Sequence, residues 1–388
     1  MRIAQLALSA ESVPPKLYGG TERVIAWLVD ELVELGHDVT LFASGDSRTS
    51  GKLHAVWPRA LRLGRRGVDP NAASALLIEA IAERACDFDV IHSHIDWLPL
   101  PVLSRTGVPF LTTMHGRLDL PGLADVIGAF PDAPFVSISD NQRLPLPNAN
   151  WITTIQHGVP RDLFRPSYER GSYLAYLGRL TAEKGPEAAI RIARAVRMPL
   201  RIAAKIPRAE TGYFKKKLEP EIDGEKIQLV GEVDEIRKQP FLAGAAALVF
   251  PIDWPEPFGL VMIEAMACGT PVIAYRSGSV PEVVEDGVTG FIVDGEQQAI
   301  EAVEEVVLLD RRKGPRTVRG ALWRGPDGAR VRKPISRVGR SRRAPIVRGK
   351  DEARRIRQRS ASFDRCRYVA GLHSLQKALP QFMYSDYD

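Results

Sequence analysis

The stretch WPEPFGLVMIEAMACGTPVIAYRSGSVPEVVEDGVTGFIV, residues 254–293, carries the signals that decide the fold. Two prolines flank Glu256 and favour an extended backbone there, because a residue before proline avoids helical angles. The apolar run that follows predicts a helix that ends at Gly269, and a short apolar strand comes next. Glu256 is therefore expected in a loop at a helix N-terminus, with Glu264 about one turn inside the helix.

These two glutamates suggest a ligand with hydroxyl and phosphate groups. A helix N-terminus presents free N–H groups and a positive dipole end, which suit a phosphate. Carboxylates beside it accept hydrogen bonds from vicinal hydroxyls, such as those of ribose or a hexose. The alternative is a coincidental spacing on a solvated helix. Glu264 stands among apolar residues, however, where a carboxylate without a partner costs several kcal/mol.

The chain length and the strand pattern predict two α/β domains. The 388 residues exceed what one ordinary core accommodates. A strand, a helix over residues 21–35 and a second strand open the chain, and short apolar strands continue at residues 89–95, 109–116, 133–140 and 152–159. The pattern begins again after residue 166, so we expect domains over 1–165 and 166–310. Ligands of such doubly wound sheets bind beyond the carboxyl ends of the strands.

The chain contains no apolar run near the roughly 20 residues that a membrane span needs. Its first ten residues, MRIAQLALSA, are typical of a first strand and lack the regions of a signal peptide. These features predict a cytoplasmic protein without a transmembrane segment.

Residues 256–274, EPFGLVMIEAMACGTPVIA, resemble the E-x7-E signature of retaining glycosyltransferases of the GT-B fold, in particular glycosyltransferase family 4. Further motifs follow the family's order: YGGTERV, TTMHG, VSISDNQR, IQHGVPRDLF, YLGRLTAEKG and GSVPEVVEDGVTGFIV. The resemblance covers about residues 1–310. It implies two Rossmann-like domains that face each other across a cleft, with the acceptor on the N-terminal side and the nucleotide-sugar on the C-terminal side.

The resemblance also implies roles for residues of the second domain. Glu256 would hold hydroxyls of the donor sugar and Glu264 those of the ribose. Arg179 and Lys184, from GRLTAEKG, would bind the diphosphate, and two cations at a strand end can indeed neutralise a departing nucleoside diphosphate. By the same resemblance Phe258, Gly259 and Leu260 contribute to donor binding.

Two sites of the first domain complete the implied set. Gly19 and Gly20 resemble the family's N-terminal glycine loop, which approaches the phosphates closely because no side chain intervenes. His115, at the end of a predicted strand, matches the histidine that meets the donor sugar. Taken alone, a Gly-Gly pair is usually a turn and a single histidine is usually structural.

The implied reaction is the transfer of a hexose from a UDP- or GDP-sugar to an acceptor hydroxyl, with retention at the anomeric carbon. A front-face route is usually proposed for such enzymes, in which the leaving phosphate oxygen helps to deprotonate the acceptor. The acceptor is an unknown carbohydrate, lipid or small molecule, and neither a metal, another cofactor nor a specific nucleic acid is expected. Two alternatives remain: a nucleotide-sugar epimerase on the same fold, and a protein that binds nucleotide-sugar without turnover.

Three other patterns give only weak evidence for a metal or nucleotide site. His92 and His94 share one strand face but lack an evident third metal ligand. The DFD sequence at residues 87–89 precedes a strand and is interpreted as a surface turn. GDSRTSGKL, residues 45–53, has one residue too many for a P-loop, and Leu53 stands where Ser or Thr would bind magnesium.

The chain changes character at Arg311. From there on it has 22 Lys and Arg against 6 Asp and Glu, whereas the first 310 residues have 31 against 41. This Arg, Gly and Pro-rich segment, 311–388, lacks a sustained period, so a packed core is not expected, and the closing helix of the family is missing. One interpretation is a basic arm that binds polyanions.

A frameshift is the other interpretation of the segment 311–388. With permitted codons, deletion of one G after the Lys313 codon lets the sequence from Arg312 read RKVRARFEERFGADRMAREYE, which is the expected family ending. Resequencing the gene tests this hypothesis. An intact frame with the same tail in close relatives would contradict it.

Overall fold

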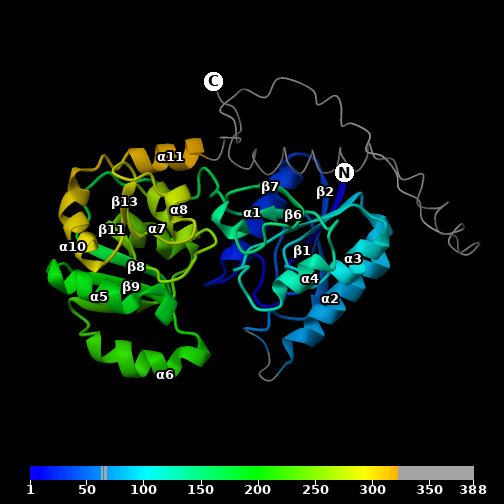
Figure 1. Cartoon of the computed structure of the whole chain (residues 1–388), viewed down its shortest axis with the longest axis horizontal. Helices are drawn as coiled ribbons and strands as arrows, with labels where there is room; N and C mark the ends of the chain where they lie inside the picture. Colours follow the sequence, from blue (N-terminus) through cyan, green and yellow to red (C-terminus); the bar gives the residue numbers. More distant parts are fainter. Residues whose placement is uncertain (63, 65–67, 322–388) are drawn as a thin grey trace, which may run out of the picture.

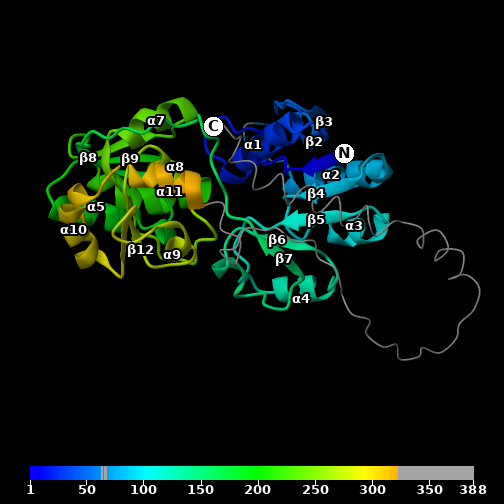
Figure 2. The same cartoon turned by 90° about the horizontal axis from the view of Figure 1, so that it is seen from above.

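The computed structural model describes residues 1–62, 64 and 68–321, which form two lobes that lie side by side (Figure 1; Figure 2). Each lobe is a parallel sheet with helices packed against it. The predicted α/β fold class is therefore confirmed. The parts of the tail and of its interpretations that concern residues 322–388 lie outside the described residues.

The N-terminal sheet has seven parallel strands in the order β3-β2-β1-β4-β5-β6-β7. All four strands predicted between residues 89 and 159 are present, and the structure adds β3, an edge strand whose residues are either exposed or half-buried. The strands are β1(Arg2–Leu6), β2(Asp38–Ser44), β3(Lys52–Trp57), β4(Val90–Ser93), β5(Phe110–Thr113), β6(Phe135–Ser137) and β7(Trp151–Thr154), and the helices are α1(Gly20–Glu34), α2(Pro70–Arg84), α3(Leu100–Thr106) and α4(Leu123–Gly128).

The C-terminal sheet has six parallel strands in the order β10-β9-β8-β11-β12-β13. Its central strand β11 is buried along its whole length, as expected where helices cover both faces of a parallel sheet. The strands are β8(Tyr173–Arg179), β9(Leu200–Lys205), β10(Ile227–Gly231), β11(Ala245–Phe250), β12(Val272–Tyr275) and β13(Gly290–Val293), and the helices are α5(Pro186–Ala195), α6(Thr211–Tyr213), α7(Glu235–Ala243), α8(Leu260–Ala267), α9(Val280–Val283), α10(Glu296–Glu305) and α11(Lys313–Ala321).

Glycines bound the helix of the opening stretch at both ends. Gly259, with φ +77°, precedes the first residue of α8, and Gly269, also with φ +77°, follows its last turn. Both angles lie in the left-handed region, which costs glycine least. The prediction of a helix after Glu256 that ends at Gly269 is confirmed.

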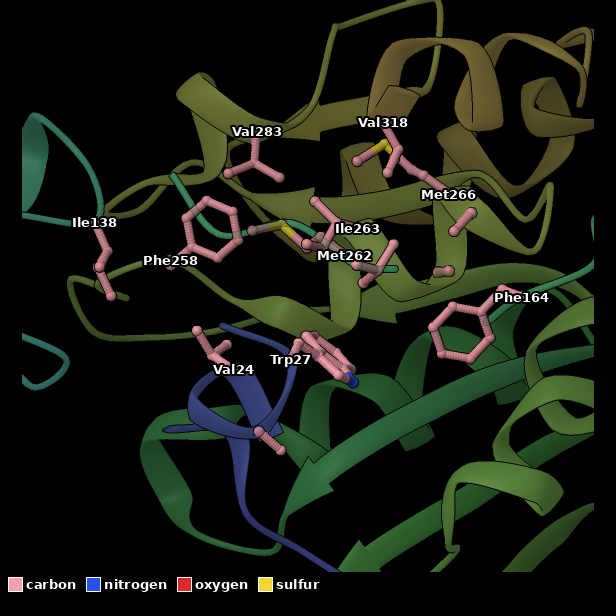
Figure 3. Packing of buried hydrophobic residues seen from close by; sticks show 14 of the residues in the cluster. Val24, Trp27, Ile138, Phe164, Phe258, Met262, Ile263, Met266, Val283 and Val318 are labelled. Atoms are coloured by element: carbon pink, nitrogen blue, oxygen red, sulfur yellow. The ribbon is translucent and has the colours of Figure 1, made fainter. Parts of the chain in front are cut away.

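One apolar cluster joins the two lobes. Val24 and Trp27 of α1 pack in the same cluster as Phe258, Met262 and Ile263 of the other lobe (Figure 3). Trp27 is only 7% exposed, although it belongs to a helix at the boundary between the domains. This contact places the N-terminus of α1 beside that of α8.

The expectation that no packed structure follows Arg311 is wrong for residues 311–321. Arg311 donates hydrogen bonds to the carbonyl oxygens of Ser167, Ala243 and Ala245, at 3.2, 3.2 and 2.9 Å. Val318 of α11 is buried and lies near Met266 of α8 (Figure 3). One arginine and one valine are enough to pack this short segment against the second domain. The average composition of residues 311–388 does not reveal two such residues.

Candidate active site

The glycine loop lies against the start of α8. A Cβ atom added to Gly20 would be 3.2 Å from the Leu260 side chain, and one added to Gly19, where φ is +154°, would be 2.7 Å from Pro15. Tyr18, the residue before, is buried enough to raise its pKa, and the charge of Arg179 opposes that shift. The loop of the first domain and the predicted donor residues of the second therefore lie close together.

Two partners contact the same carboxylate oxygen of Glu256, Oε2. It forms an ion pair with Lys184 and accepts a hydrogen bond of 2.9 Å from the indole N–H of Trp254. The side chains of Lys184 and Glu256 are each 12% exposed. Burial lowers the pKa of Lys184, and the charge of Glu256 opposes that shift. The ammonium group also lies 4.4 Å from the centre of the Trp254 ring, at cation–π distance.

The motif that begins at Gly278 fixes the backbone of this loop. A Cβ atom at Gly278, where φ is +55°, would lie 2.3 Å from the backbone N and O of Glu256. The Ser277 hydroxyl donates to the Trp254 carbonyl at 2.5 Å, and the Ser279 hydroxyl to that of Phe258 at 2.8 Å. Gly278 is thus required for the close approach that orients Glu256.

Arg179 ends β8 and lies 3.7 Å from Glu183 across an ion pair. Its Nε atom is buried and has no hydrogen-bond partner among the described residues. With Lys184 it places two cations at the carboxyl end of this strand, where the sequence predicted them.

Glu264 is almost fully buried and paired. Its carboxylate accepts a hydrogen bond of 2.5 Å from Lys238 of α7, and the two residues expose 1% and 4% of their surface. Burial is the main cause that lowers the pKa of Lys238, and the charge of Glu264 opposes it. The sequence predicted a buried carboxylate but missed this partner, which occurs in the unremarkable helical segment EIRKQPF.

Phe258 and Gly259 form the backbone that leads into α8. The Phe258 side chain is 3% exposed and contacts the His157 ring edge-on at a centroid distance of 5.0 Å. No side chain caps the N-terminus of α8, whose preceding residue is Gly259. The free N–H groups of this first turn are suited to an anion.

His115 lies at the carboxyl edge of the N-terminal sheet. Its Nε2 atom is 2.8 Å from Nδ1 of His94, and its ring stacks on that of His157 with centroids 5.2 Å apart. His92 instead contacts the Thr113 hydroxyl, at 2.8 Å. Among the residues that the structure describes, no group of three or more His, Cys, Asp or Glu side chains is arranged to hold a metal ion.

The DFD sequence is a surface turn, as predicted. Asp87 pairs with Arg84 and Asp89 with Arg2, each at 2.9 Å, and all four side chains are more than a third exposed.

Several polar contacts connect the two domains. Arg23, which is 6% exposed, donates to the carbonyls of Gly19 and Leu17 and lies 3.2 Å from Glu235 of the second domain. Arg62 contacts Glu232 at 3.0 Å. Glu282 accepts hydrogen bonds of 2.8 and 2.7 Å from two backbone N–H groups of the first domain, those of Asp140 and Asn141.

Within the described residues, no helix is both long and apolar enough to cross a membrane.

Two family models match the chain in succession. The model described as Glycosyltransferase Family 4 matches residues 18–163, and that described as Glycosyl transferases group 1 matches residues 164–316. The two matches meet next to residue 165, and together they span most of the described chain.

Curated proteins similar to the chain include two D-inositol 3-phosphate glycosyltransferases. That of Catenulispora acidiphila, numbered 2, is 26% identical over 357 residues, which cover 75% of this chain and 82% of that protein. That of Mycobacterium tuberculosis is 27% identical over 289 residues, which cover 61% of this chain and 58% of the mycobacterial protein.

Solved structures with the same architecture include a glycosyltransferase, a synthase and a protein solved with UDP and glucose. AviGT4, which is involved in avilamycin A biosynthesis, has a TM-score of 0.62 at 25% identity and covers 83% of this chain and 93% of its own. Sucrose-phosphate synthase from Thermosynechococcus elongatus has a TM-score of 0.70 at 20% identity, and the match covers 83% of this chain and 94% of the synthase. Anabaena HepE, solved with UDP and glucose, has a TM-score of 0.62 at 19% identity, and the match covers 82% of this chain and 92% of HepE.

Proposed function

We propose that the chain transfers a hexose from a UDP- or GDP-sugar to an acceptor hydroxyl with retention of configuration, because the family 4 and group 1 glycosyltransferase models match it in succession. The observation that supports this most directly is the grouping of Arg179, Lys184 and Glu256 at the carboxyl end of β8, opposite the glycine loop. The two cations, which suit a diphosphate, and the carboxylate, which suits sugar hydroxyls, then face one ligand.

In the proposed reaction, Lys184 moves from Glu256 to the diphosphate when the donor binds. Arg179 and Lys184 stabilise the negative charge that develops as the nucleoside diphosphate leaves, and Glu256 is released to accept hydrogen bonds from sugar hydroxyls. The leaving phosphate oxygen accepts the proton of the acceptor hydroxyl on the same face. We further propose that these two cations supply the charge that a metal supplies in metal-dependent transferases, and that the protein acts in the cytoplasm.

Titration calorimetry with a panel of nucleotide-sugars tests donor binding, beginning with UDP-glucose. One donor should bind to the wild-type protein, and Glu256→Gln should weaken it about tenfold, the effect of roughly 1.4 kcal/mol lost with a charged hydrogen bond. Glu296→Gln, which alters a half-buried glutamate paired with Arg191 on α5, is the matched control and should leave binding unchanged. Failure of every donor to bind would contradict the proposal.

The product then identifies the reaction. An anomeric configuration equal to that of the donor, with turnover undiminished by EDTA, is expected. An inverted anomeric configuration would refute retention. A loss of turnover with EDTA that added Mg²⁺ or Mn²⁺ restores would refute metal independence. Formation of a sugar epimer without acceptor would indicate an epimerase, and binding without release of nucleotide would indicate an impaired enzyme. A set of polyol, phosphorylated and lipid-linked acceptors covers the open acceptor class.

A further inference from the structure

A row of side chains connects strand β1 of the N-terminal sheet to His115, the predicted sugar-binding histidine. Gln5 of β1, fully buried, lies with its Oε1 atom 2.8 Å from Nε2 of His94. Nδ1 of His94 is in turn 2.8 Å from Nε2 of His115. Three residues that are far apart in the chain thus form one hydrogen-bonded line.

The two imidazoles in this line are neutral at physiological pH. Burial lowers the pKa of His115 to about 3 and that of His94 well below its usual value, and neighbouring histidines lower the latter further. A neutral imidazole has one N–H group and one bare nitrogen, so each ring donates at one end and accepts at the other.

The direction of the line is set by the Gln5 amide, whose Oε1 atom faces His94 while its Nε2 atom is buried without a hydrogen-bond partner among the described residues. An oxygen only accepts, so the proton of His94 resides on Nε2 and its Nδ1 is bare. That bare nitrogen accepts from His115, whose proton therefore also resides on Nε2. Nδ1 of His115 is then a lone pair, and it is buried with no hydrogen-bond partner in the part of the chain that the structure describes. A buried acceptor of this kind requires a donor.

We propose that Gln5 and His94 are positioning residues that hold His115 as its Nε2–H tautomer, so that Nδ1 accepts a hydrogen bond from a hydroxyl of the donor sugar. The inference rests on the proposed function, since the sugar is the ligand. It also specifies the chemistry at this position: the lone pair requires a hydrogen-bond donor, which a sugar hydroxyl supplies.

Long-range ¹H–¹⁵N spectra of the protein labelled at histidine test the tautomer without any substitution. The chain has seven histidines, and single His→Asn variants assign the two signals. Both His94 and His115 should show a protonated Nε2 and a bare Nδ1. A protonated Nδ1 on His115 would mean that the Gln5 amide is turned round, and would overturn the inference.

Gln5→Leu tests the relay, and Thr113→Val is its matched control. Gln5→Leu removes the acceptor, so His115 should become a mixture of tautomers and kcat/KM should fall about tenfold. Thr113→Val removes the neighbouring buried contact to His92 and should leave the His115 signals and kcat/KM as they are. Equal effects of the two variants, or an unaltered tautomer in Gln5→Leu, would contradict a positioning role.

Deoxy analogues of the donor identify the hydroxyl. One analogue should lose about tenfold in kcat/KM with the wild-type protein and nothing further with His115→Ala, because the two changes remove the same hydrogen bond. Additive losses for every analogue would overturn the recognition step. Absence of turnover with any donor would refute the proposed function and this recognition step together, whereas the spectra decide the tautomer on their own.

Discussion

Removal of Lys238 should strongly destabilise the protein while its partner remains. Lys238 and Glu264 are 4% and 1% exposed and 2.5 Å apart, so Lys238→Met leaves a carboxylate buried without a counter-charge. Breaking a buried pair in this way costs about 3–5 kcal/mol, whereas replacing both members by apolar residues is often neutral or stabilising. We therefore expect Lys238→Met to lower the free energy of unfolding in urea by that amount and Lys238→Met/Glu264→Leu to recover most of it.

The double variant also separates structure from function at Glu264. If its carboxylate holds the ribose, the stable double variant should still bind the donor at least tenfold more weakly than the wild type. Arg237→Met is the control for charge removal on α7, because its pair with Asp234 is exposed and contributes about 0–1 kcal/mol. A loss below about 1 kcal/mol for Lys238→Met, or no recovery in the double variant, would refute the reasoning.

Three further substitutions test the packing of the site. His92 is fully buried with a pKa of about 3, so only the unfolded chain takes up its proton between pH 6.5 and 3. Its own share of the stability lost on going to pH 5 is about 2 kcal/mol, so His92→Gln should reduce the total loss by about that amount, and an unchanged loss would contradict this. Gly278→Ala should lower kcat and reduce the free energy of unfolding by roughly 1–3 kcal/mol, because the new Cβ atom displaces the Glu256 backbone. Gly287→Ala is the control and should cost less, since φ is also positive there but no atom lies within 4 Å of the added Cβ. Equal costs for the two variants would exclude the clash. Arg23→Met should reduce kcat/KM about tenfold, with the fold retained by circular dichroism, because its charged hydrogen bonds hold the glycine loop; unchanged kinetics would contradict this.

Local signals in the sequence were sufficient for the fold class. The alternation of short apolar strands and amphipathic helices predicted both sheets, because parallel strands are buried on both faces and stand out as apolar runs. Gly269 and the prolines around Glu256 predicted the loop and helix boundaries, since both residue types restrict or extend the backbone locally. The catalytic and binding roles of the residues in the site stay predictions.

The partners of the site residues could not be predicted, because each depends on the packing of distant elements. Trp254 stands two residues before Glu256, but nothing in that spacing indicates that its indole N–H donates to the carboxylate. Gln5 and Lys238 gave no signal at all, since a single polar residue in a strand or helix usually faces solvent. Hydrogen bonds of this kind become visible only when the tertiary structure defines which side chains share a buried space.

The change of composition at Arg311 does not coincide with a change of structure, and this bears on the frameshift hypothesis. Arg311 joins the linker at Ser167 to the start of β11, and Gly314 lies so close to α8 that a Cβ atom would be 2.9 Å from the Met266 carbonyl oxygen. Arg311 precedes the proposed site of insertion at Lys313, whereas Gly314 follows it and would be valine in the restored frame. The contacts of Arg311 therefore lie in the original frame, and the contact of Gly314 with α8 lies in the shifted one. A frame-restored protein should keep the first and replace the second; if it melts at the same temperature as the present chain, the altered residues contribute nothing to the support of α8.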